Sequence, residues 1–232
     1  MDIIYDIETF PNCFTLTAMD DHLDFLTWQF EISDRRDDSE AIREWVEWLS
    51  RSGGRMIGFN NVGFDYPILH MLLSCDHLQM QGVLYRKCQE IINSQDNNRW
   101  AHMVYPSNRK CPQVDLYLIH HFDNRAKATS LKTLEFNMRM DNVSDLPFEV
   151  GTMLNSNQID VLLKYNLHDV VATRMFYHES IDAIRFRENL TKDYGVDFLN
   201  FNDTKIGKQF FVMMLEMSGV VCYDVGPEGR KP

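Results

Sequence analysis

The sequence has few of the residues that build disulfide frameworks or zinc sites. It contains five cysteines among 232 residues, an odd number, and no Cys-x-x-C pair. This usage argues against zinc knuckles and redox motifs, and scattered reduced thiols are typical of cytosolic proteins. A chain of this length buries enough apolar surface to fold without disulfide bonds.

Long apolar runs and a basic leader are also missing. No apolar run approaches the length of about 18 residues that a membrane-spanning helix needs. The N-terminal residues, MDIIYDIE, lack the basic n-region of a signal peptide. We therefore expect a cytoplasmic protein that does not use a membrane as a partner.

Basic residues are scarce overall but locally enriched. The net charge is −11, and residues 1–50 carry 13 acidic and 3 basic side chains. Residues 86–139 instead carry 9 basic and 5 acidic side chains. Such a stretch is either a phosphate-contacting surface or an ordinary solvated face.

The apolar periodicity predicts an α/β protein. Strands are expected at residues 2–6, 12–19, 22–31, 56–59 and 113–117, the second and third forming an antiparallel hairpin. Helices are expected at 39–49, 64–73, 78–93, 130–140, 156–177, 179–193 and 204–217, with an irregular stretch at 94–112. The strand–loop–helix order around residues 56–73 indicates a parallel crossover.

The first strand carries the first candidate site residues, Asp6 and Glu8. Because side chains alternate along a strand, both carboxylates project from one face. Two carboxylates this close repel each other unless a cation lies between them, and Mg²⁺ prefers such oxygen ligands. An acidic turn is the alternative for this stretch taken alone, since residues 38–40 repeat the Asp-x-Glu pattern without a preceding strand.

Two further carboxylates occur where sites are expected. Asp65 begins the helix after the fourth strand, near the strand edge where α/β sheets place their sites. Asp169 lies four residues after Tyr165 in a predicted helix, so both side chains share one face.

These motifs, in this order, resemble the DEDD superfamily of 3′→5′ exonucleases. Its first motif, Asp-x-Glu, matches Asp6-Ile7-Glu8, and its third, Tyr-x-x-x-Asp, matches YNLHD. Its second motif, Asn followed by Phe/Tyr-Asp, matches GFNNVGFDYPIL, where either Asn60 or Asn61 fits. The stretches VDLYLI and SLKTLEF are similar to the proofreading domains of family B, phage-type DNA polymerases. The tyrosine subclass fits best, because the histidine subclass would place a histidine at Lys164.

The resemblance implies a ribonuclease H-like fold, with a five-stranded mixed sheet flanked by helices, over residues 1–195. Residues 196–232 would form a C-terminal helix and tail that connects to a polymerase or partner. The implied cofactors are two Mg²⁺ or Mn²⁺ ions per site. The implied substrate is a single-stranded or frayed 3′ end of DNA.

The resemblance also implies a role for each matching residue. Asp6, Glu8 and Asp169 would hold one ion, and Asp6 with Asp65 the other. Tyr165 would orient the attacking water. The expected substrate-binding residues are Asn60, Phe64 and Lys132.

Several alternatives stay open from the sequence. The chain is a standalone nuclease, a proofreading subunit or part of a longer polymerase, and a viral source would place it in the host cytoplasm. The runner-up activity is a DEDD-type exoribonuclease. A third possibility is an inactive module that only binds nucleic acid or protein.

Overall fold

The structure is a computed structural model that describes residues 1–22, 26–98, 101–141, 143, 145–222, 224–226 and 229–231. Side chains are not described at 95–98, 224–226 and 229–231. The chain divides into two compact units. The first unit is Met1–Tyr117 with Thr129–Ile181, and the second is Leu118–Ala128 with Asp182–Pro232. Every predicted site residue belongs to the first unit.

Five strands form the sheet of the first unit, in the order β3-β2-β1-β4-β5. They are β1 (Asp2–Phe10), β2 (Cys13–Asp20), β3 (Thr27–Ser33), β4 (Arg55–Gly58) and β5 (Gln113–Asp115). β2 is antiparallel to β1 and β3, whereas β4 is parallel to β1 and β5. The predicted α/β class with a mixed five-stranded sheet is therefore confirmed, as is the antiparallel hairpin.

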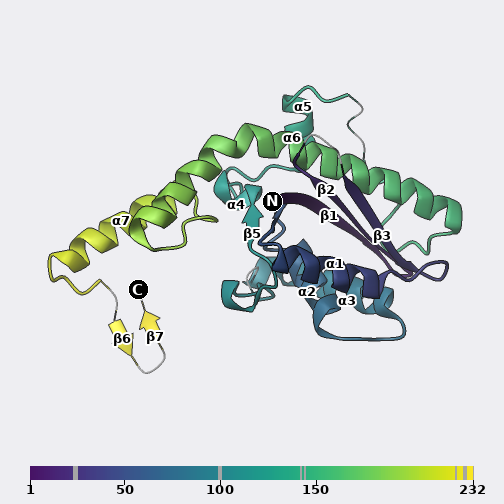
Figure 1. Ribbon diagram of the computed structural model, residues 1–232, viewed down its shortest axis with the longest axis horizontal. Helices are drawn as coiled ribbons and strands as arrows, with labels where there is room; N and C mark the ends of the chain where they lie inside the picture. The colour runs from purple at the N-terminus through teal and green to yellow at the C-terminus, as the bar shows by residue number, and fades with distance from the viewer. Residues whose placement is uncertain are drawn as a thin grey trace. The chain divides into compact units, whose positions relative to one another are not determined.

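One face of the sheet is covered by α1 (Ser39–Arg51), α2 (Asp65–Ser74) and α3 (Met80–Asn98) (Figure 1). Ile3, Tyr5 and Ile7 of β1 are buried in a core with apolar residues of these helices. Because β1 alternates, its intervening side chains, including Asp6 and Glu8, face the other way. The apolar half of β1 thus sets the direction of the two carboxylates.

The opposite face of β1–β3 is covered by the part of α6 (Ser156–Tyr194) that belongs to the first unit, residues 156–181, which Figure 1 shows running along the strands. Its Ile159 and Leu162 pack with Phe10 and Cys13 of the sheet. The short helix α5 (Leu131–Asn137) precedes it, with Ser130 as its cap. The carboxylates of β1 therefore face α6.

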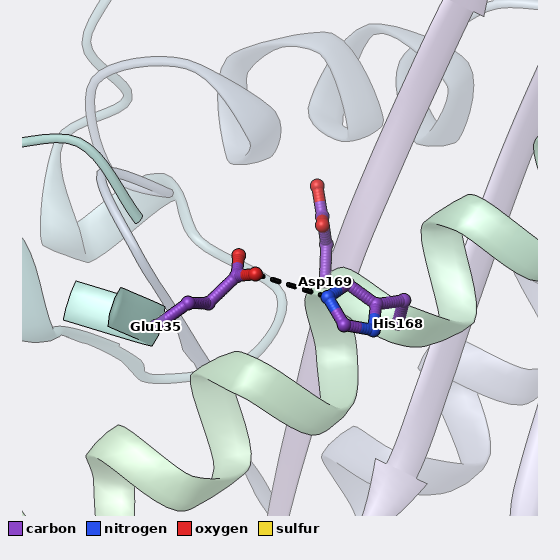
Figure 2. A group of neighbouring side chains, drawn as sticks. All are labelled: Glu135, His168 and Asp169. Atoms are coloured by element: carbon purple, nitrogen blue, oxygen red, sulfur yellow. Dashed lines mark hydrogen bonds and ion pairs between the residues drawn. The ribbon is translucent and has the colours of Figure 1, made fainter. Parts of the chain in front are cut away.

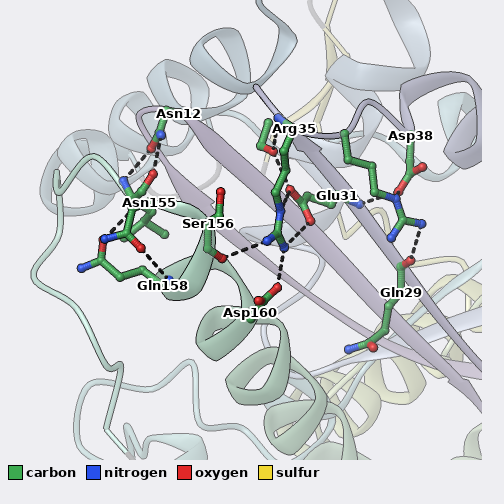
Figure 3. A network of polar contacts seen from close by, with 12 residues as sticks. Asn12, Gln29, Glu31, Arg35, Asp38, Asn155, Ser156, Gln158 and Asp160 are labelled. Carbon is green, nitrogen blue, oxygen red and sulfur yellow. Dashed lines mark hydrogen bonds and ion pairs between the residues drawn. The ribbon is translucent and has the colours of Figure 1, made fainter.

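A polar clamp holds the start of α6 against the sheet (Figure 3). Arg35 donates to both oxygens of the buried Glu31 carboxylate, at 2.8 and 2.9 Å, and also to Ser156 O and Asp160 Oδ1. Nearby, the Asn12 side chain pairs in both directions with the backbone of residue 154, at 2.9 Å. These bonds fix where α6 begins over the strands.

The second unit contains the end of α6, α7 (Asp203–Met217) and a small hairpin of β6 (Asp224–Gly226) and β7 (Gly229–Lys231). Arg187, almost fully buried, donates to the carbonyls of Ile119 and Phe201 and to the Asp203 carboxylate. Two shorter elements complete the assignment: η1 (Pro106–Asn108) and α4 (Leu116–Ile119).

Several predicted element boundaries were wrong. Residues 156–194 form one helix instead of two, and α3 continues to residue 98 into the stretch expected to be irregular. β5 ends at residue 115 and α4 begins at residue 116, inside the expected strand. Helix α5 ends before residue 140 because Arg139 adopts a left-handed φ of 57°. The expected third strand includes residues 23–25, which lie outside the described residues. Among the described residues, no helix is both long and apolar enough to cross a membrane.

Candidate active site

Two strands build the floor of the candidate site. Asp6 and Glu8 lie opposite Thr17 and Thr15 of β2 in the antiparallel register. Directly paired residues point to the same face, so both threonines share the face of the carboxylates. Both threonines are fully buried, whereas Asp6 and Glu8 are partly exposed. The carboxylates are thus the accessible polar groups of this floor.

Helix α6 supplies the third carboxylate from the opposite side. Carboxylate oxygens of Asp6, Glu8 and Asp169 lie within 4.8 Å of one another, so they could hold one metal ion. Tyr165 lies close enough to Asp169 to influence the pKa of its carboxyl, as expected for residues four apart on a helix. The structure therefore brings together four of the predicted residues from two separate stretches of the sequence, β1 and α6.

Asn166 is a supporting residue that the sequence interpretation missed. Its Nδ2 donates to Asp6 Oδ2 at 2.6 Å, and its Oδ1 accepts from Thr15 Oγ1 at 3.3 Å. The side chain is fully buried. The sequence feature that could have identified Asn166 is its position three residues before Asp169, since residues three apart share a helix face.

Asp65 is the fourth carboxylate and lies beside the group of three. It is the first residue of α2 and is 5% exposed. Its Oδ1 accepts from the backbone N–H of Ile7, the residue between Asp6 and Glu8, at 3.4 Å. Asp65 is not within the 4.8 Å group but is close enough to raise the pKa of Asp6.

The loop before α2 places the side chains of the two candidate asparagines in different environments. Asn61 is fully buried and donates to Gln113 Oε1 at 2.9 Å, so its side chain is part of the core. Asn60 is partly exposed, has a left-handed φ of 64°, and donates its backbone N–H to Asp115 Oδ1 at 3.0 Å. Only Asn60 is therefore available to a ligand. Phe64 is half-buried against the core at the start of α2.

Helix α5 approaches the site from another direction. Lys132 forms an ion pair with Asp145, and its charge partly opposes the rise that burial causes in the pKa of Glu8 and of Asp169. Glu135 Oε2 lies 3.0 Å from His168 Nε2, and Figure 2 shows this contact with Asp169 beside it. Glu135, His168 and Asp169 form a second group with ligand atoms within 4.8 Å of one another.

The carboxylates of the site gather negative charge in a buried place. Burial raises the pKa of Asp65 to about 7 and that of Asp169 to about 6. Burial, followed by the neighbouring carboxylates, also raises the pKa of Asp6 and Glu8 well above their ordinary values. Burial and Asp169 raise the pKa of Tyr165, so its hydroxyl keeps its proton. A divalent cation would replace the protons that this cluster otherwise takes up.

The donor set fits a hard divalent cation. The group of Asp6, Glu8 and Asp169 offers only oxygen ligands, which suit Mg²⁺ and Mn²⁺.

Neither a scan against models of protein families nor a search of curated proteins found a match to this chain.

Proposed function

We propose that this chain is a metal-dependent 3′→5′ exonuclease of the DEDD superfamily, tyrosine subclass, that hydrolyses DNA to nucleoside 5′-monophosphates. One observation carries the proposal: Asp6, Glu8 and Asp169 converge within 4.8 Å from a strand and a helix about 160 residues apart in sequence. The mixed five-stranded sheet flanked by helices is compatible with a ribonuclease H-like fold.

The carboxylates would hold two Mg²⁺ or Mn²⁺ ions. Asp6, Glu8 and Asp169 would bind one, and Asp6 with the adjacent Asp65 the other. Two such ions stabilise charge on the attacking and leaving oxygens of a phosphodiester. Asn166 would keep the Asp6 carboxylate in one orientation through its 2.6 Å hydrogen bond.

The remaining residues would position water and substrate. Tyr165 keeps its hydroxyl proton beside Asp169, where it would orient the attacking water. Asn60 would hydrogen-bond the terminal nucleotide, and the half-buried Phe64 would pack against its base. Lys132, close enough to influence Glu8, would contact a phosphate.

The similarity to family B proofreading domains favours DNA over RNA and a role in replication beside a DNA polymerase. The test is degradation of a 5′-labelled single-stranded DNA with Mg²⁺ or Mn²⁺, compared with an RNA of the same sequence. A ladder that shortens from the 3′ end and disappears in Asp6→Ala is the expected result, with DNA degraded faster. No cleavage of either strand with either metal would contradict the proposal and favour a binding module.

A further inference from the structure

The surface of α5 carries a large aromatic side chain exposed to solvent. Phe136 is 76% exposed, although apolar residues in a short helix usually face the core. Phe136, Asn137, Arg139 and Met140 line a surface hollow of about 550 Å³. That volume is in the range of small-molecule sites, so the hollow is large enough for a nucleotide base.

The helix that carries Phe136 is anchored to the candidate active site. Glu135, the preceding residue, is 1% exposed and hydrogen-bonded to His168, the neighbour of Asp169 (Figure 2). Glu135 and Asp169 have oxygens within 4.8 Å of each other. The position of Phe136 is therefore tied to the carboxylate cluster by a buried polar contact.

One cation and one aromatic ring lie on α5, and a second cation follows shortly after the helix. Lys132 and Phe136 are four residues apart and share one face of the helix. Lys132 influences the pKa of two site carboxylates, whereas Phe136 lies one helical turn further along. Arg139 is exposed and follows two residues after the end of α5, and within the described part of the chain it forms no ion pair.

We propose that α5 is a binding track for the single strand that leads into the site. One base, upstream of the 3′-terminal nucleotide, stacks on Phe136, and Arg139 contacts a phosphate of the same strand. Aromatic rings that alternate with cations are the usual means of binding single strands without sequence preference. This inference rests on the proposed function for its substrate, but it concerns binding rather than cleavage.

Binding is measured in an Asp6→Ala background, which prevents degradation, by fluorescence anisotropy of a 5′-fluorescein-labelled dT12. Phe136→Ala should weaken binding by about tenfold, the size of one lost base stack, while Phe136→Tyr retains affinity. The matched control is Trp48→Ala, an exposed aromatic on α1, on the other face of the sheet. Asparagine tolerates the left-handed backbone at position 139. Arg139→Asn should therefore reduce the magnitude of the slope of log affinity against log salt concentration by about 0.7.

Cleavage separates this inference from the proposed function. If the parent chain degrades DNA, Phe136→Ala should raise KM for dT12 and leave the rate on a dinucleotide unchanged. Equal affinity of Phe136→Ala and its parent for dT12, or no binding by either, overturns the inference. If binding depends on Phe136 but the parent chain cleaves nothing, the inference stands and the exonuclease proposal fails.

Discussion

Asn166 is a buried amide that holds the Asp6 carboxylate in one orientation. Its Nδ2 donates to Asp6, and its Oδ1 is itself held by Thr15, so the Asp6 carboxylate has a defined orientation before any ligand arrives. Groups that orient metal ligands in this way commonly contribute 10–100-fold to metal affinity or activity.

The Asn166→Ala variant tests this role. We expect the Mn²⁺ concentration for half-maximal cleavage to rise by about 10–100-fold, because Asp6 loses its only side-chain donor among the described contacts. Asn93→Ala, at an exposed position of α3, serves as the matched control. An unchanged metal requirement in Asn166→Ala would show that Asp6 needs no such support.

At the scale of single residues, the sequence predicted which carboxylates converge but not the side chains that hold them. Strand alternation was sufficient to place Asp6 and Glu8 on one face, and helical spacing to pair Tyr165 with Asp169. Asn166 and the choice of Asn60 over Asn61 depend on partners on other strands, Thr15 and Gln113. Local periodicity carries no information about such partners.

Among the secondary-structure elements, α6 does most to assemble the site, and the Arg35 clamp fixes its start. Glu31 is 1% exposed, so the negative charge of its carboxylate depends on the guanidinium of Arg35 as its counterion. Removing one partner of a buried pair is costly, because the other charge is left without its counterion.

Arg35→Ala should therefore destabilise the protein by about 3 kcal/mol, the lower end for a broken buried pair, since Arg35 itself is partly exposed. The measurement is urea unfolding followed by circular dichroism. The control is Arg51→Ala, which removes an exposed pair with Glu47 and should change stability by less than about 1 kcal/mol. Equal effects of the two substitutions would show that the clamp does not hold α6.

Element boundaries were predictable where a capping or breaking residue marks them. Gly53 ends α1 with a left-handed φ of 68°, and Asn202 caps α7 by accepting from Lys205 N at 2.8 Å. Helix α6 was divided in error near residue 178, although no glycine or proline interrupts it before Gly195. The environment of α6 changes along its length, which obscures the helical spacing of its apolar residues. Only the absence of a helix-breaking residue indicates that it is a single helix.

For the whole molecule, the buried carboxylates of the candidate site link stability to pH. The folded-state pKa of Asp65, about 7, and that of Asp169, about 6, lie above the unfolded value near 3.8. Their stabilising contribution is therefore complete below about pH 4 and is lost as the pH rises through 6 and 7. Between pH 5.5 and pH 8, Asp65 alone accounts for about 2 kcal/mol.

In EDTA, the melting temperature should fall by about 5–10 °C between pH 5.5 and pH 8. Mn²⁺ at pH 8 should restore it, because the bound ion compensates the carboxylates. Differential scanning fluorimetry measures both effects, and Asp65→Asn should show a weaker pH dependence. A melting temperature that rises over this range and ignores Mn²⁺ would contradict the electrostatic description of the site.

The sequence contains the Asp-x-Glu pattern twice, and this allows the most direct test of the central claim. Glu8 belongs to the carboxylate cluster, whereas Glu40 lies on the exposed face of α1. The measurement is the rate of 3′-end degradation of single-stranded DNA in Mn²⁺ for Glu8→Gln and Glu40→Gln. We predict that Glu8→Gln lowers the degradation rate by more than about 100-fold, which exceeds the usual cost of losing a residue that only supports a ligand. Glu40→Gln should keep the full rate. Equal rates in the two variants would show that the cluster of Asp6, Glu8 and Asp169 is not the active site.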